Sequence, residues 1–169
     1  GQRMGYFNLP DSQKKRMLQV KIFNNSDFPL EVQAKMANAS TLTNGVVSYD
    51  SKYQPDAKLL GNPGTNYLSS NSEVNIAGKS SSTFTITVKP FDFKGMKAAA
   101  INFIGTPANQ SSAIQNQYVY TVGIVLNGKN LTDQEIKKTR VQSISLAKKA
   151  KEIKIELANP AAAYLMNEE

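Results

Sequence analysis

The segment YVYTVGIVLNG at positions 118–128 decides the fold class. Apolar side chains stand at every second position from Tyr118 to Leu126, which is typical of a β-strand with one face against a core. Gly123 lies in the middle of this run and is a candidate β-bulge. Asn127-Gly128 then supplies the strongest short turn signal that a sequence offers. The segment therefore predicts a half-buried strand that ends in a turn.

The same period of two recurs upstream. Its apolar positions are 18, 20 and 22, then 30, 32, 34 and 36, then 74 and 76, and then 84, 86 and 88. The turn formers from Asn24 to Pro29 separate the first two runs and predict a β-hairpin there. About seven strands fall between residues 17 and 126, and this number predicts an all-β fold, an immunoglobulin-like antiparallel β-sandwich.

Two further strands are predicted at 141–146 and 153–157, on either side of the basic run at 148–151. Two strands cannot bury a core alone, so we expect a partial second β-domain or a hairpin at the C-terminus. The predicted organisation is a sandwich at 1–128, a linker at 129–140 and the first strands of a truncated second domain at 141–169. Thr132 and Glu135 have the spacing of a helix capping box, although a plain linker fits this stretch equally well.

The composition excludes several chemistries. The chain contains no Cys and no His, so it can form neither a disulfide nor a Ser-His-Asp triad, and zinc, copper and haem lose their usual ligands. Asp50, Asp56 and Asp92 lie in predicted loops, where aspartates commonly cap turns. We therefore predict no enzyme activity, no catalytic residues, no metal site and no cofactor.

The charge balance is basic, with 20 Lys and Arg against 13 Asp and Glu. A cationic surface suits anionic polymers such as teichoic acid or the peptide carboxylates of peptidoglycan. Nucleic acid is not expected as a partner, because the sequence has no helix-turn-helix pattern and no aromatic RNA-binding motif. Alternatively, the lysines only keep the surface soluble and protect sheet edges from pairing.

The long irregular segment at 50–72 is the candidate binding region, since long loops in compact domains are often functional. Tyr49, Tyr53 and Tyr67 lie on or beside it, and Asn66 belongs to its polar run. Exposed tyrosines can stack on glycan rings, and amides can bond to sugar hydroxyls. The alternative is that these rings fold down over the open end of the sandwich. We take Tyr49, Tyr53, Tyr67 and Asn66 as candidate ligand-binding residues.

Several short motifs occur in a characteristic order. They are YFNL at 6–9, NNS at 24–26, ASTLTNGVVSY at 39–49, DAKL at 56–59, PFDFKG at 90–95 and AAINF at 99–103. Their order and spacing resemble the WxL-interacting protein family of Gram-positive cell surfaces, over about residues 6–126. Residues 139–160 resemble the start of the family's second domain. One departure is Ala99-Ala100, where the family usually has a Gly-Gly pair.

The resemblance implies an extracellular protein at the bacterial cell wall, with an N-terminal peptidoglycan-binding domain. It implies WxL-domain surface proteins as partners, and host extracellular proteins as partners of the second domain. We expect the membrane anchor of the family to lie outside this sequence, which has no window of 18 apolar residues. The predicted function is a non-catalytic binding and scaffold module. The alternative is a pilus-type assembly chaperone that acts by strand donation.

Overall fold

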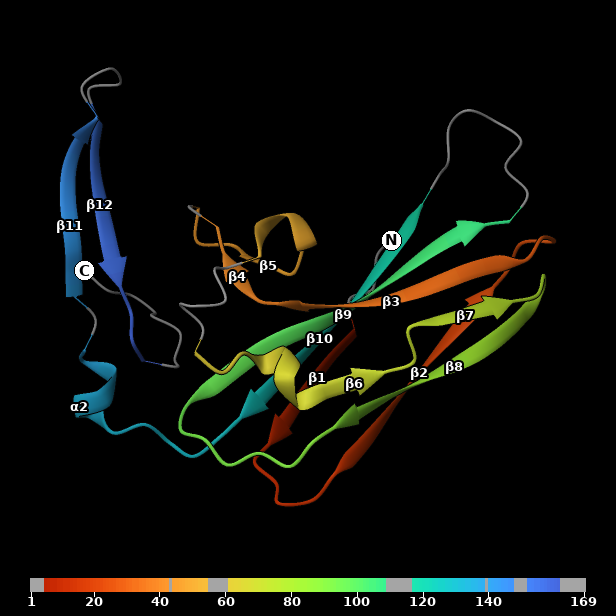
Figure 1. The fold of residues 1–169 in the computed structure, drawn as a ribbon, viewed down its shortest axis with the longest axis horizontal. Coiled ribbons are helices and arrows are strands. Elements are labelled where there is room, and N and C mark those ends of the chain that lie inside the picture. The colour runs from red at the N-terminus through yellow and green to blue at the C-terminus, as the bar shows by residue number, and fades with distance from the viewer. Residues whose placement is uncertain are drawn as a thin grey trace.

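A computed structural model of the protein describes residues 5–42, 44–54, 61–108, 117–138, 140–147 and 152–161. Two sheets pack face to face in it (Figure 1). The five-stranded sheet has the order β1 (Gly5–Pro10), β10 (Tyr118–Asn127), β9 (Met96–Pro107), β3 (Leu30–Asn38) and β7 (Glu73–Ile76). The three-stranded sheet has the order β2 (Arg16–Asn24), β8 (Ser80–Val88) and β6 (Leu68–Ser70). The predicted immunoglobulin-like sandwich is confirmed.

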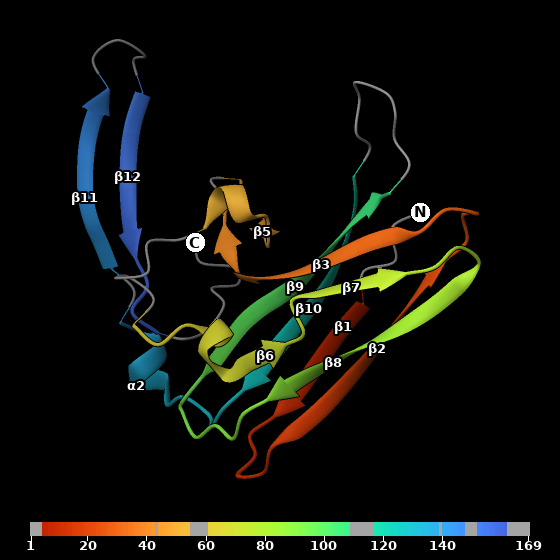
Figure 2. The same cartoon turned by 45° about the vertical axis from the view of Figure 1, so that its right-hand side comes forward.

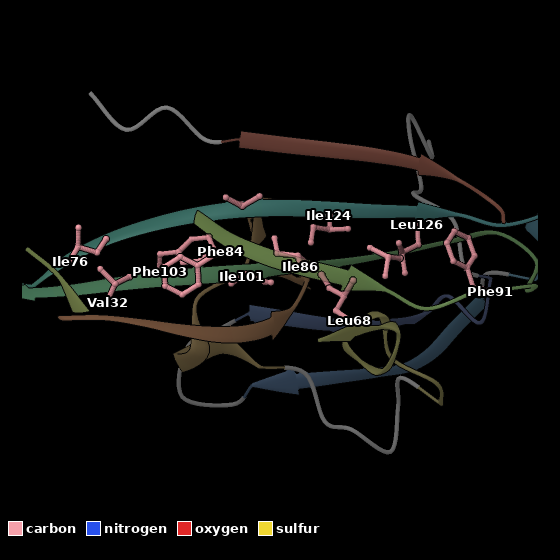
Figure 3. Close-up of a cluster of buried hydrophobic side chains, with 13 residues drawn as sticks. Val32, Leu68, Ile76, Phe84, Ile86, Phe91, Ile101, Phe103, Ile124 and Leu126 are labelled. Atoms are coloured by element: carbon pink, nitrogen blue, oxygen red, sulfur yellow. The ribbon is translucent and has the colours of Figure 1, made fainter. Parts of the chain in front are cut away.

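The core lies between the sheets, where the alternating apolar residues of both sheets meet (Figure 3). Phe84 of β8 is completely buried, and its ring meets that of Phe103 of β9 edge to face, with centroids 4.9 Å apart. The other members of this buried cluster are Val32, Leu68, Ile76, Ile86, Val88, Phe91, Ala99, Ile101, Val122, Ile124 and Leu126. The period of two in the sequence therefore identified the inward face of β8 correctly. On β10 the predicted face is buried from Val122 to Leu126, whereas Tyr118 and Tyr120 on the same face are exposed.

The hairpin predicted for residues 18–36 is wrong. β2 pairs with β8 along all nine residues, whereas β3 pairs with β9 and β7 in the other sheet. The turn formers between them make a crossover, in which the buried amide of Asn24 donates hydrogen bonds to the carbonyls of Phe28, Ile76 and Ala77. Turn residues signal a reversal of the chain, but only long-range pairing decides which strand is the neighbour.

β1 was not predicted as a strand, and it lies parallel to β10. The β-bulge predicted at Gly123 is also wrong, because the pairing of β10 with β9 runs through Gly123↔Ala100 without a shift. The ring of Tyr6 on β1 instead lies against this glycine, and an added Cβ would come within 2.9 Å of it. Gly123 thus provides room for a neighbouring ring.

The C-terminal part consists of α2 (Asp133–Ile136) and a hairpin of β11 (Arg140–Ala147) and β12 (Glu152–Ala158), which stands to one side of the sandwich (Figures 1 and 2). Val141, Ile144, Ile153 and Ile155 remain between 54% and 67% exposed. The hairpin is confirmed, whereas the division of the chain at 128 and 140 stays a prediction. The basic run at 148–151 lies outside the described residues, as do most of the polar loop at 106–117 and residues 162–169.

The capping box predicted at α2 is present. The hydroxyl of Thr132 and the carboxylate of Glu135 bond to each other's backbone N–H groups. Lys94 also donates a hydrogen bond to this carboxylate at 2.8 Å, which links α2 to the sandwich. No helix in the described part of the chain is long and apolar enough to cross a membrane.

The Glu135 carboxyl is expected to titrate near pH 2. The hydrogen bond from Lys94, followed by those from Thr132, lowers the pKa of Glu135 to about 2. Because this pKa lies below the ordinary value of 4.5, the carboxylate stabilises the fold above about pH 4.5 and loses this effect as the pH falls toward 2. An NMR titration of the side-chain carboxyl measures the midpoint. In the Lys94→Met variant the titration midpoint of Glu135 should rise without reaching 4.5, because Thr132 still donates hydrogen bonds to the carboxylate. An unchanged midpoint would mean that the hydrogen bond from Lys94 does not lower this pKa.

Candidate ligand-binding site

A polar pocket of about 370 Å³ lies where the end of β3, the start of β9 and residues 159–161 meet the 3-10 turn η2 (Gly64–Tyr67). Its described polar side chains are three asparagines and one lysine. The described residues of its lining are Asn38, Ala39, Asn62, Pro63, Gly64, Met96, Lys97, Ala98, Asn159, Pro160 and Ala161. We call this site the polar pocket.

Asn38, at the end of β3, forms hydrogen bonds with η2 and with Gln54. Its side-chain oxygen accepts a hydrogen bond from the Thr65 N–H of η2 at 3.1 Å. Its backbone N–H donates to Oε1 of Gln54 at 3.0 Å. Gln54 follows η1 (Ser51–Tyr53), and its Nε2 also donates to the Asp50 carbonyl, so the turn at 50–54 is fixed to the same corner.

The amide of Asn62 is oriented by two of the residues predicted from the sequence. Its Nδ2 donates to the hydroxyl of Tyr67 at 2.6 Å, and its Oδ1 accepts from Nδ2 of Asn66 at 2.9 Å. A side-chain amide has two N–H groups and two acceptor sites. These two bonds use one N–H group and one acceptor site of the Asn62 amide.

Small residues bring η2 directly onto β9. A Cβ added at Gly64 would lie 3.2 Å from the Cβ of Ala99 and 3.5 Å from the backbone of Ala98. Ala99 and Ala100, the departure from the family's Gly-Gly pair, are fully buried in the strand, and neither has a positive φ. Alanine therefore satisfies the packing at these two positions.

Lys97 supplies the charge of the polar pocket. Its ammonium lies over the ring of Phe93, 5.0 Å from the centroid, and partial burial lowers the pKa of Lys97 from its ordinary value of 10.5. Phe93 in turn packs against Tyr67 and Phe91, with ring centroids 5.4 and 5.1 Å away. Among the described residues, no carboxylate forms an ion pair with Lys97. A partly desolvated cation without a carboxylate partner favours an anionic ligand group.

The four predicted ligand residues do not form one aromatic cluster. Asn66 and Tyr67 contact the polar pocket through Asn62, and the ring of Tyr67 is half-buried against Phe91 and Phe93. Tyr67 thus covers the end of the sandwich, as the alternative interpretation expected, while its hydroxyl stays in the polar network.

The other two tyrosines lie elsewhere. Tyr49 is only 7% exposed, its hydroxyl is 2.6 Å from that of Tyr6, and its carbonyl accepts a hydrogen bond from Asn102 on β9. Tyr53, in η1, is 53% exposed. The sequence gives no sign of a binding role for Asn38, Lys97 or Asn159, because each is ordinary in its own segment and only the fold brings them together.

The polar pocket is suited to binding. Among the described residues of its lining, Lys97 is the only ionisable side chain. No group of three or more Asp, Glu, His or Cys that could hold a metal occurs in the described part of the chain. The amides and the ammonium provide fixed hydrogen bonds and one positive charge.

The fold defines a β-sandwich module, and the polar pocket is its candidate ligand-binding site. Residues 1–105 match the family model described as WxL Interacting Protein, peptidoglycan binding domain. This match covers more than half of the chain, so the protein belongs to the WxL-interacting protein family, and the predicted resemblance is confirmed. Membership makes the chain a cell-wall binding module. No curated protein matches the chain in sequence.

Solved structures with a similar fold share little sequence with it. PapD-like domain 7 of human CEP192 is 9% identical, with a TM-score of 0.48, over 77% of this chain and 84% of that one. WR4, an MSP family member of C. elegans, is 12% identical, with a TM-score of 0.40, over 70% and 91%. The E. coli chaperone DraB is 14% identical, with a TM-score of 0.48, over 83% and 62%. The chain thus spans less than two thirds of DraB.

Proposed function

We propose that this protein is a non-catalytic cell-surface module that binds peptidoglycan in the polar pocket and scaffolds WxL-type surface proteins. The observation that carries the proposal is the lining of the pocket, with three asparagine amides around a lysine that pairs with no described carboxylate. Membership in a family whose matched domain is peptidoglycan-binding supports the choice of ligand.

The chemistry of peptidoglycan matches this lining. Its sugars carry hydroxyl and acetamido groups, which bond to amides such as those of Asn38 and Asn62, and its stem peptides carry carboxylates for Lys97. The apolar surfaces of Pro63 and Met96 suit the acetamido methyl groups. Shallow contacts of this kind give modest affinity per site, and a polymer that repeats the ligand offers many equivalent sites.

Co-sedimentation with purified sacculi across salt concentrations tests the proposal. The protein should pellet at low salt and keep part of its binding at about 0.5 M NaCl, because neutral hydrogen bonds are not screened while long-range charge attraction is. Sacculi with and without teichoic acid separate the two anionic polymers. Absence of binding at low salt, or complete loss at moderate salt, would contradict the pocket as the site. A pilus-type chaperone would instead form a stable 1:1 complex with a subunit and leave sacculi unbound.

Replacing Asn62 with alanine is expected to weaken sacculus binding about three- to tenfold, because the loss of one or two neutral hydrogen bonds has about this effect on affinity. The dissociation constant from the pelleted fraction measures the change. Asn71→Ala, an exposed asparagine outside the pocket, is the matched control. Equal affinity of the two variants would place the ligand elsewhere.

The scaffold role needs a separate measurement. Purified protein should co-elute with a WxL-domain protein in size-exclusion chromatography, and Asn62→Ala should leave this complex intact if the partner binds away from the polar pocket. Independent elution at micromolar concentrations would contradict the scaffold role without affecting the peptidoglycan proposal.

A further inference from the structure

A second hollow, of about 640 Å³, opens at the side of the sandwich between β2 and the start of β10. The buried residues Val32 and Phe103 lie at its base. Its described lining also includes Val20, Lys21 and Ile22 of β2 and Tyr118 and Tyr120 of β10. We call this hollow the side groove. It shares no residue with the polar pocket.

The side groove exists because β2 is covered less completely than its neighbour β8. Every inward residue of β8 from Phe84 to Val88 is buried, whereas the inward residues Leu18, Val20 and Ile22 of β2 are only partly buried. The two sheets therefore meet tightly over β8 and stand open beside β2. Apolar surface in this opening remains available to a further element.

β2 is also an open sheet edge. It pairs with β8 along all nine residues, and no other described strand pairs with it (Figure 2). Nine extended residues span about 30 Å. An unpaired edge of this length presents a row of backbone N–H and C=O groups, onto which an extended peptide can add as a new strand.

Between Asp11 and Asp27, the charged residues along this edge are all basic. Residues 12–26 contain Lys14, Lys15, Arg16 and Lys21 and no Asp or Glu. The guanidinium of Arg16 donates to the backbone carbonyls of Pro10 and Asp11, and no described carboxylate forms an ion pair with it. Asp27, which follows the segment, forms an ion pair with Lys79 at 3.3 Å.

We propose that β2 and the side groove bind an extended acidic segment of a partner protein. The segment adds as a strand to the three-stranded sheet, places alternate apolar side chains in the groove and sets its carboxylates beside the basic residues. A second copy of this chain fits poorly, because two β2 edges side by side would bring the same basic residues together. This partner surface is independent of the proposed peptidoglycan site.

A labelled decapeptide of alternating valine and aspartate tests the proposal by fluorescence anisotropy with the whole protein. It should bind, and amide hydrogen exchange should slow at residues 16–24. The corresponding valine–lysine peptide should not bind. Equal binding of both peptides, or no protection of β2, would overturn the proposal.

Two sets of charge reversals provide the matched comparison. Lys14→Glu, Lys15→Glu and Lys21→Glu together should weaken peptide binding at least about tenfold, through lost attraction and new repulsion. The same change at three other exposed lysines, Lys35, Lys52 and Lys137, should have a much smaller effect. Equal effects of the two sets would overturn the proposal.

Two further readouts separate this proposal from others. Val20→Thr keeps the shape of the residue but adds a hydroxyl group. This variant should bind the valine–aspartate peptide more weakly, while its circular dichroism spectrum shows an intact fold. Sacculus binding should be the same for both charge-reversal sets, so the peptidoglycan proposal can fail or stand separately. Protection of β2 that depends on protein concentration without peptide would show that a second copy occupies the edge.

Discussion

Replacing Phe84 with alanine is expected to lower the free energy of unfolding by about 3–5 kcal/mol, the range for loss of a large buried aromatic side chain. Phe84 is completely buried at the centre of the three-stranded sheet, and its ring packs edge to face on Phe103. Domains of this kind have total stabilities of about 5–15 kcal/mol. The substitution should therefore remove a large part of the stability. Urea unfolding followed by tyrosine fluorescence measures the change.

Phe28→Ala is the matched control for Phe84→Ala. Phe28 lies in the crossover between β2 and β3 and is largely exposed, so its loss should change the stability by no more than about 0.5 kcal/mol. Similar losses in the two variants would mean that the centre of the core lies elsewhere than between β8 and β9.

Replacing Lys97 with glutamate is expected to weaken sacculus binding more than tenfold. A hydrogen bond between charged groups contributes about 1.5–3 kcal/mol, which is tenfold or more in affinity. The substitution also places a carboxylate where the ligand's anionic group should bind. Co-sedimentation with sacculi at fixed salt measures the change in the dissociation constant.

Lys35→Glu is the control for this effect. It makes the same change in net charge at an exposed position of β3 that does not line the polar pocket. If Lys97→Glu and Lys35→Glu bind sacculi equally weakly, the binding depends on the overall positive charge of the protein and not on the polar pocket. A Lys97→Glu variant that binds like the unaltered protein would contradict both the pocket and the charge.

The fold class could be predicted because the sandwich is built from strands with clear alternation. Phe84, Ile86 and Val88 all point into the core, as their spacing indicated. The partners of each strand could not be predicted, since the stretch from Asn24 to Pro29 fits a hairpin and a crossover equally well. β1 was missed because its outward ring, Tyr6, lies on Gly123 of a strand more than 110 positions away in the sequence.

The candidate site was predictable only in part. Tyr67 and Asn66 were noticed because they belong to a long polar loop, and the structure connects both to the polar pocket through Asn62. Lys97 lies at the start of a strand that carries no local sign of a binding role. Its significance arises from the ring of Phe93 below it and from the three asparagines that the fold gathers from distant segments.

The parallel pairing of β1 with β10 determines how the sandwich responds to mechanical tension between residues 5 and 127. Six residue pairs join the first strand of the sandwich to its last, from Gly5↔Val122 to Pro10↔Asn127. A force that pulls residues 5 and 127 apart acts along both strands in opposite directions. All six pairs then bear the load in shear together, whereas an antiparallel terminal pair pulled from the same ends would open one pair at a time.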